Sequence, residues 1–308
     1  MIFIDVFFIV CGAVLLWFGA DFVVDSASAI AARFRISELI VGLTIVAMGT
    51  SLPEFMVTFL SALKSLPNIS LSNVVGSNIF NLGIILGSMA VISPISIEKK
   101  MVYRDGFFLL GIILTVMFFL QDLTMGRVAG AVLISSFITY LIWIAAKTPR
   151  LPVEIDIVYR KSKWWDYPKL IGGIIFLALG ANLLVDHASS LARHFGLSEW
   201  FIGVTIVAAG TSLPELATSL AAALRGKNEM LVGNLLGSDI FNFAGVLGIT
   251  SLIHPLTVSP IGLFNVKISA LSLILLLVFM RTGWQLSRVE GLILITINLL
   301  RWLRDYLH

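Results

Sequence analysis

The chain has 308 residues, of which 58% are hydrophobic and 13% are charged, with a mean hydropathy of +0.99 and a formal net charge of +3. A soluble core of this length cannot bury so much apolar surface, so the composition excludes a soluble globular protein and indicates no nucleic-acid partner. The single cysteine, Cys11, excludes a disulfide framework and a cysteine metal cluster. We therefore expect an all-α polytopic membrane protein that has the lipid bilayer as its surroundings.

Ten segments are apolar and long enough to cross a bilayer, at roughly 20 residues per crossing. The first segment lacks a basic leader and a small-residue cleavage site, so we interpret it as a retained helix and not as a signal peptide. In chain order the predicted spans are 6–24, 38–63, 70–92, 105–121, 126–146, 167–187, 199–224, 230–253, 260–280 and 287–303.

The two halves of the chain are copies of each other. Residues 19–97 align with residues 180–258 at a constant offset of 161, with 33 identities in 79 positions. Each copy has five predicted spans, and because five is odd, the second copy enters the membrane upside down relative to the first. We therefore predict ten transmembrane helices in two inverted five-helix repeats, residues 1–147 and 167–308, joined by a cytoplasmic linker over residues 148–166.

The distribution of positive charge indicates the orientation of the chain. Lys and Arg accumulate on the cytoplasmic side of membrane proteins, and 15 of the 21 fall on that side if the N-terminus is outside. We expect a multi-pass protein of the cell (plasma or inner) membrane with both termini outside. The oligomeric state stays open, with a monomer as one option.

The hexapeptide Gly-Thr-Ser-Leu-Pro-Glu occurs once in each repeat and ends at Glu54 and at Glu215. A carboxylate inside a membrane span is costly unless it is compensated, so it marks a functional site by default. No Lys or Arg occurs in residues 36–63 or 194–224. These glutamates must therefore be protonated or be neutralised by a cation from solution.

Neutral oxygen groups recur around both glutamates. The prolines free backbone carbonyls about one turn earlier, and the hexapeptide hydroxyls lie within a turn of each carboxylate. Downstream, Ser77 and Asn81 are four residues apart and share one helical face, as do their counterparts. Such hard oxygen ligands suit Na⁺ or Ca²⁺ and not zinc or copper. The candidate ligands that both copies keep in register are Glu54, Glu215, Thr50, Thr211, Ser51, Ser212, Ser77, Ser238, Asn81 and Asn242.

One further acid lies in the second block. Asp239 is matched by Asn78 in the first repeat and lies three residues before Asn242, about 60° around the helix. A direct ligand role for Asp239 is therefore left open.

The paired hexapeptides, with Gly-Ser-Asn-Ile-Phe-Asn ending at Asn81 and Gly-Ser-Asp-Ile-Phe-Asn ending at Asn242, resemble the alpha-repeats of the cation/calcium exchanger superfamily. The similarity is closest to prokaryotic sodium/calcium exchangers and covers nearly the whole chain. It implies a secondary transporter and no enzyme, no cofactor, four cation sites near mid-membrane, and sliding of the first and sixth helices. It also implies that Ca²⁺ is bound by Glu54, Glu215, Thr50 and Thr211, and Na⁺ by Ser51, Ser77, Ser212 and Ser238 with carbonyls near Ala47 and Ala208.

Together these features predict antiport of Na⁺ against Ca²⁺ by alternating access. The two glutamates supply a charge of −2, enough for one Ca²⁺ or two Na⁺, so the two loads exclude each other, and the empty site resists the switch. A third Na⁺ per cycle, which the resemblance implies, makes the exchange electrogenic. Because Asn242 stands where potassium-dependent relatives use an acid, we expect no K⁺ requirement.

Three other functions remain in view. A proton/calcium exchanger would use the same glutamates, and a channel would show fluxes without a coupled counter-ion. An intramembrane serine hydrolase would need Ser51 or Ser212 beside a general base, but no His recurs with either serine.

Overall fold

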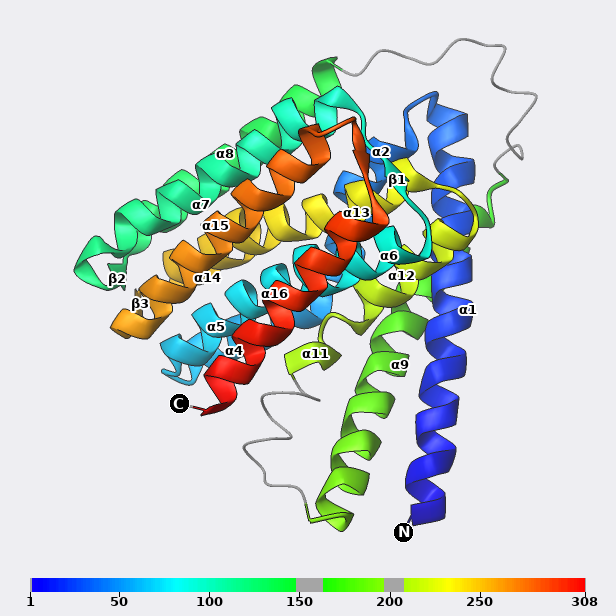
Figure 1. Cartoon of the computed structure of the whole chain (residues 1–308), viewed down its shortest axis with the longest axis horizontal. Helices are drawn as coiled ribbons and strands as arrows, with labels where there is room; N and C mark the ends of the chain where they lie inside the picture. Colours follow the sequence, from blue (N-terminus) through cyan, green and yellow to red (C-terminus); the bar gives the residue numbers. More distant parts are fainter. Residues whose placement is uncertain (1, 148–162, 197–207, 308) are drawn as a thin grey trace.

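A computed structural model of the chain describes residues 2–147, 163–196 and 208–307. These residues form a bundle of helices with a few two-residue strands at its ends (Figure 1). Most of the predicted linker over 148–166 and the first part of the predicted span over 199–224 lie outside the described residues.

The apolar segments of the first repeat form helices, several of which continue through a short π-helical stretch. The longest is α1, and α5, η2 and α6 together make one helix over residues 67–92. The elements of the first repeat are α1 (Ile2–Phe34), α2 (Glu38–Val41), η1 (Gly42–Val46), α3 (Ala47–Thr50), α4 (Leu52–Leu63), α5 (Pro67–Phe80), η2 (Asn81–Ile85), α6 (Leu86–Ile92), β1 (Ile95–Ser96), η3 (Met101–Gly106), α7 (Phe107–Phe119), η4 (Leu120–Asp122), β2 (Thr124–Met125) and α8 (Arg127–Lys147).

The second repeat follows the same plan where it is described. Its α13, η7 and α14 make one helix over residues 228–253, the counterpart of the helix over 67–92. The elements are α9 (Asp166–His194), α11 (Ala208–Gly210), α12 (Leu213–Leu224), α13 (Asn228–Ile240), η7 (Phe241–Val246), α14 (Leu247–Ile253), β3 (Leu256–Thr257), α15 (Pro260–Arg281), β4 (Gln285–Leu286) and α16 (Arg288–Leu307).

The described residues contain seven helices that are long and apolar enough to cross a membrane. An eighth candidate is the pair Glu38–Thr50 and Leu52–Leu63, which is bent by 48°. The prediction of an all-α membrane protein is therefore confirmed. By length and composition, however, the described helices supply seven or eight candidate spans and not the predicted ten. The shortfall has two reasons: the predicted span 199–224 begins outside the described residues, and the predicted span 287–303 is α16, which has charged residues near both ends.

The two repeats interlock through an approximate twofold relation. The strand pairs are β1 with β4 and β2 with β3, and the offset of 161 converts one pair into the other. The register follows this relation, because Ile95 opposes Leu286 while Leu256 opposes Met125. In the same way α6 packs on α16, and α14 packs on α8. The last helix of each repeat therefore covers a helix of the other repeat.

Two helices at one edge of the bundle, α1 and α9, pack closely along each other (Figure 1). Gly12 faces Gly180, and Gly19 faces Gly173, so the two backbones touch at two levels. A Cβ atom on Gly173 would lie 2.9 Å from the carbonyl oxygen of Gly19. Small residues at such a seam allow close helix packing in membranes, so α1 and α9 form one tight unit.

The Gly173→Leu substitution is expected to destabilise the protein by about 1–3 kcal/mol, because the side chain overpacks the seam between α1 and α9. Thermal unfolding of the purified protein in detergent measures the effect. Gly172→Leu, one residue away, is the matched control, since a Cβ atom there meets no described heavy atom within 4 Å. Equal unfolding temperatures for the two variants would show that the seam does not hold the helices together.

Candidate functional site

Each copy of the hexapeptide interrupts a helix. Ser51 separates α3 from α4 with φ −85° and ψ 10°. Thr211 and Ser212 separate α11 from α12, and Ser212 has φ −89° and ψ 8°. A proline follows at the second position of each new helix, where a missing N–H breaks no helical hydrogen bond. Glu54 and Glu215 therefore lie in the first turns of α4 and α12, where the helix dipole favours a negative charge.

The two glutamates are fully buried, and each is bonded by the opposite repeat. Ser212 Oγ donates to Glu54 Oε1 at 3.2 Å, and Ser51 Oγ donates to Glu215 Oε1 at 2.8 Å. These two bonds are images of each other at the offset of 161. Ser238 Oγ also donates to Glu215 Oε1, at 3.1 Å. The carboxylate site is therefore shared between the repeats and belongs to neither alone.

The asparagine-containing blocks form a second set of cross-repeat bonds. Asn81 Nδ2 donates to Asp239 Oδ1 at 3.1 Å, and Asn242 Nδ2 donates to the equivalent Asn78 Oδ1 at 2.9 Å. All four side chains are buried. Asp239 thus lies inside the site. The two halves of this network differ here, because the second repeat has Asp239 at the position where the first repeat has Asn78.

Two serines contact the amides, and one of them, Ser238, also bonds the Glu215 carboxylate. Ser238 Oγ accepts from Asn81 Nδ2 at 3.3 Å and lies 2.6 Å from Ser51 Oγ. Ser77 Oγ accepts from Asn242 Nδ2 at 3.4 Å. The four-residue spacing that the sequence places on one helical face therefore brings serine and asparagine to one site, although each asparagine contacts the serine of the other repeat.

Several buried oxygens of this site have no hydrogen-bond donor among the described residues. An orphaned buried acceptor costs about 1–3 kcal/mol, and a cation with oxygen ligands satisfies several of them at once. None of the described ion pairs includes Glu54, Glu215 or Asp239. The orphaned atoms are Glu54 Oε2, Glu215 Oε2, Asp239 Oδ2, Asn81 Oδ1, Asn242 Oδ1 and Thr211 Oγ1.

Acidic side chains alone do not complete a metal site here. In the part of the chain that the structure describes, no three His, Cys, Asp or Glu side chains converge closely enough to hold a metal ion. A cation between the glutamates would therefore need the hydroxyl and amide oxygens as further ligands. Neutral oxygens of this kind are ordinary ligands of hard cations.

The two threonines of the predicted ligand set differ from each other. Thr50 Oγ1 lies 3.2 Å from the carbonyl oxygen of Ala47 and 3.3 Å from Asn234 Oδ1, whereas Thr211 Oγ1 is one of the orphaned atoms. The Ala47 carbonyl also accepts from the Ser51 amide at 3.0 Å, so both of its acceptor positions are occupied in this conformation. Ala208, its counterpart, is the first residue of α11.

Sequence reasoning did not include two residues that the structure places in the network. Asn234 contacts Thr50, and Asn78 bonds Asn242 as well as the backbone carbonyl of Asp239. Both residues lie in the duplicated blocks. The identity of Asn73 and Asn234 at the repeat offset was a detectable sign for the first of them.

A cavity of about 330 Å³ borders the site at Thr211. It lies between α4, α9 and α11, and its walls include Pro53, Ala178, Asn182 and Thr211. The counterpart helices, α12 and α1, pack directly along each other. The approach to the site is therefore asymmetric although the repeats are alike.

The chain resembles known proteins over nearly its full length. The sequence profile described as sodium/calcium exchanger protein matches residues 4–146 and 168–300. The CaxA protein of Alkalimonas amylolytica, whose name marks its antiporter assignment as provisional, is 36% identical in an alignment of 300 positions that covers 94% of each chain. Sodium/calcium exchanger MaX1 of Methanosarcina acetivorans is 32% identical in an alignment of 339 positions, gaps included, that covers 96% of each chain. A solved structure of the sodium-calcium exchanger NCX_Mj, soaked with zero Na⁺ and Ca²⁺, matches with a TM-score of 0.85 at 31% identity, covering 97% of this chain and 98% of that one.

Proposed function

This chain belongs to the sodium/calcium exchanger family, and we propose that it exchanges Na⁺ for Ca²⁺ across the cell membrane by alternating access. Members of this family are secondary transporters and not enzymes. The observation that carries the choice of ions is the buried oxygen cage around Glu54 and Glu215, which has orphaned acceptors and no described ion pair. Such a cage attracts hard cations of this size and charge.

In this proposal every cation contacts both repeats. Because Ser51 bonds Glu215 and Ser212 bonds Glu54, an ion held by either glutamate also lies near a hydroxyl of the opposite repeat. The Ala47 carbonyl becomes available when the Thr50 hydroxyl turns toward the ion. We assign Ca²⁺ to Glu54, Glu215, Thr50 and Thr211, and Na⁺ to Ser51, Ser77, Ser212 and Ser238 with the carbonyls of Ala47 and Ala208, while Asn81 and Asn242 complete the set.

Charge balance supports exchange by mutual exclusion. Glu54 and Glu215 lie at helix N-termini that favour their ionised forms, whereas Asp239 lies within a continuous helix and accepts one amide bond. We therefore propose that Asp239 is neutral and that the glutamates provide a charge of −2. One Ca²⁺ or two Na⁺ balance this charge, and the empty site resists the switch because unbalanced carboxylates would cross a dry barrier. A third Na⁺ per cycle makes the exchange electrogenic.

We also propose ten spans in two inverted repeats, residues 1–147 and 167–308, with both termini outside. The seven or eight candidate spans and the twofold strand pairing support this arrangement. With this orientation, α4 lies in the outer half of the membrane, and so does the cavity between α4 and α9 that borders Thr211.

Uptake of radiolabelled Ca²⁺ into proteoliposomes tests the proposal directly. Vesicles loaded with Na⁺ and diluted into Na⁺-free choline buffer are expected to accumulate Ca²⁺, whereas vesicles with equal Na⁺ on both sides are not. Dilution into K⁺ buffer is expected to give the same uptake, since no K⁺ requirement is proposed. If three Na⁺ leave for each Ca²⁺ that enters, net positive charge leaves the vesicle, so an inside-positive potential is expected to speed Ca²⁺ uptake. Slower uptake under that potential would mean instead that net positive charge enters.

Two other results would change the assignment. Uptake that is driven by a pH gradient and is indifferent to Na⁺ would identify a proton/calcium exchanger that uses the same glutamates. Ca²⁺ flux that needs no counter-ion gradient would identify a channel.

A further inference from the structure

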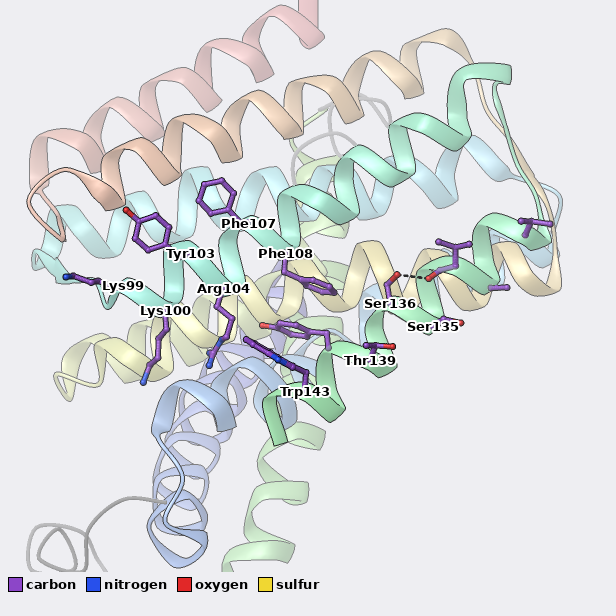
Figure 2. Close-up of a pocket in the computed structure, with 14 residues that line it drawn as sticks. Lys99, Lys100, Tyr103, Arg104, Phe107, Phe108, Ser135, Ser136, Thr139 and Trp143 are labelled. Carbon is purple, nitrogen blue, oxygen red and sulfur yellow. Dashed lines mark hydrogen bonds between the residues drawn. The ribbon is translucent and has the colours of Figure 1, made fainter. Parts of the chain in front are cut away.

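A second large concavity lies away from the cation site, between η3 with α7 and α8. This groove has a volume of about 1240 Å³. On α8 its lining runs from Val128 to Trp143, a rise of roughly 22 Å at 1.5 Å per residue. Figure 2 shows Arg104, Phe108 and Trp143 extending into the space between the two helices, with Lys99 and Lys100 at one end. The groove is thus long, aromatic along its walls and basic at one end.

The basic end combines fixed and available charges. Arg104 is held by two bonds to the buried Asp105, which also accepts from Tyr140 Oη at 2.7 Å. Lys100 pairs with Glu98 at 2.7 Å, but 38% of its side-chain area remains exposed. Lys99 forms no ion pair within the described ranges and lies 5.6 Å from the ring centre of Trp284. Lys99 and Lys100 can therefore reach a ligand without losing a buried contact.

The carboxylates around this end do not cancel its positive charge. Arg281 also faces the cluster, since its Nε atom donates to the Tyr103 hydroxyl at 2.7 Å. Four cations, Lys99, Lys100, Arg104 and Arg281, thus stand against three carboxyl groups, those of Glu98, Asp105 and the nearby Glu229. The cations therefore exceed the carboxyl groups by one, and Lys99, Lys100 and Arg281 keep accessible side chains at this end.

Apolar lining alone would not indicate a specific ligand, because every membrane-facing surface contacts acyl chains, and Trp and Tyr are common at the interface. The repeat provides the comparison. The equivalent positions of Lys99, Lys100 and Arg104 in the second copy are Pro260, Ile261 and Asn265, although that copy folds in the same way. Folding of the helix pair therefore does not require the cations.

We propose that this groove binds one phospholipid with an anionic headgroup from the cytoplasmic leaflet. In the orientation proposed above, Lys99 and Lys100 lie at the cytoplasmic surface, where anionic headgroups are attracted by basic side chains. The phosphate lies against the two lysines, and one acyl chain runs along Phe107, Phe108 and Trp143. The open side of the groove faces the bilayer, so the lipid can enter laterally.

Native mass spectrometry of the full chain tests the proposal. Purified protein in detergent is mixed with equal amounts of phosphatidylglycerol and phosphatidylcholine that have identical acyl chains, and the retained lipids are counted. At least one phosphatidylglycerol is expected to remain bound in preference to phosphatidylcholine. Lys99→Gln with Lys100→Gln is expected to lower this preference by about fivefold per removed charge. Ala131→Trp, which fills the groove and leaves its charges in place, is expected to lower retention of the lipid itself.

Two matched controls separate a site from general surface effects. Arg33→Gln with Arg35→Gln removes two exposed cations on the same proposed face outside the groove, and Ile138→Trp adds the same ring to an exposed position of α8 that does not line it. Both controls are expected to keep the lipid and its selectivity. Equal retention of both lipids by the unmodified protein, an equal loss in the arginine control, or unchanged retention in Ala131→Trp would each overturn the proposal.

Discussion

Replacing Glu54 or Glu215 with glutamine is expected to reduce Na⁺-driven Ca²⁺ uptake by about 100-fold or more. Each change keeps the shape of the side chain and removes one unit of charge from a fully buried site. A Ca²⁺ ion opposite a single carboxylate would then carry an uncompensated buried charge, which costs at least several kcal/mol. Initial uptake rates in proteoliposomes, normalised to the amount of reconstituted protein, measure the effect.

Asp239→Asn is the matched control for this pair of substitutions. It also converts a buried carboxyl to an amide, and it makes the second repeat identical to the first at this position, where Asn78 is found. Because we propose that Asp239 is neutral, this variant should retain most of the transport activity. A loss as large as that of the glutamine variants would instead make Asp239 a third charged ligand, and normal uptake in either glutamine variant would refute the site.

Removal of two hydroxyls, by Ser51→Ala with Ser212→Ala, is expected to weaken the apparent Na⁺ affinity by about tenfold or more. Ser51 Oγ lies 2.8 Å from Glu215 Oε1 and 2.6 Å from Ser238 Oγ, and Ser212 Oγ lies 3.2 Å from Glu54 Oε1. The variant loses two oxygen ligands. It leaves Glu54 Oε1 without its hydroxyl donor, at a cost of about 1–3 kcal/mol, and leaves Glu215 Oε1 with Ser238 as its hydroxyl donor. The Na⁺ concentration that gives half-maximal Ca²⁺ exchange measures the change.

A buried serine elsewhere provides the control for this second prediction. Ser70 is fully buried, and its hydroxyl donates to the Thr58 carbonyl at 3.0 Å without touching either glutamate. Ser70→Ala is expected to leave the Na⁺ dependence unchanged. If the double serine variant also kept its Na⁺ dependence, or if it lost Ca²⁺ binding to the same extent as Na⁺ binding, the assignment of these serines to Na⁺ would fail.

Much of the site could be predicted because the duplication repeats its parts. Glu54, Ser51 and Asn81 each have an identical counterpart at the offset of 161, so the ligand types were visible without any structure. The partners of these residues were not. Helical-face reasoning placed Ser77 beside Asn81, but the amide of Asn81 bonds Ser238 and Asp239 of the other repeat.

The site asparagines lie where the regular α-helix gives way to a π-helical stretch. Asn81 begins η2, and Phe241 with Asn242 begins η7, where the backbone departs from the α-helical period of 3.6 residues per turn. Extrapolation along a regular helix therefore loses accuracy at the residues that matter most. The span count differs for another reason. The charged residues near the ends of α16 lower the hydropathy of this helix, so it does not count as a candidate span.

The sequence by itself determined the membrane class, the duplication and the chemical types of the site residues, because hydropathy, internal identity and residue type are properties of the chain alone. The tertiary structure decided which oxygens meet. It brought Asp239 and Asn234 into the network and joined Ser51 and Ser212 each to the glutamate of the opposite repeat. It left a cavity beside α9 but close packing beside α1. It also placed Lys99 and Lys100 at the end of a groove whose other wall lies on α8. The physical reason is that these contacts depend on the relative placement of helices that are far apart in the chain. Close backbone packing, such as that of Gly19 on Gly173, sets this placement, and no local sequence pattern specifies it.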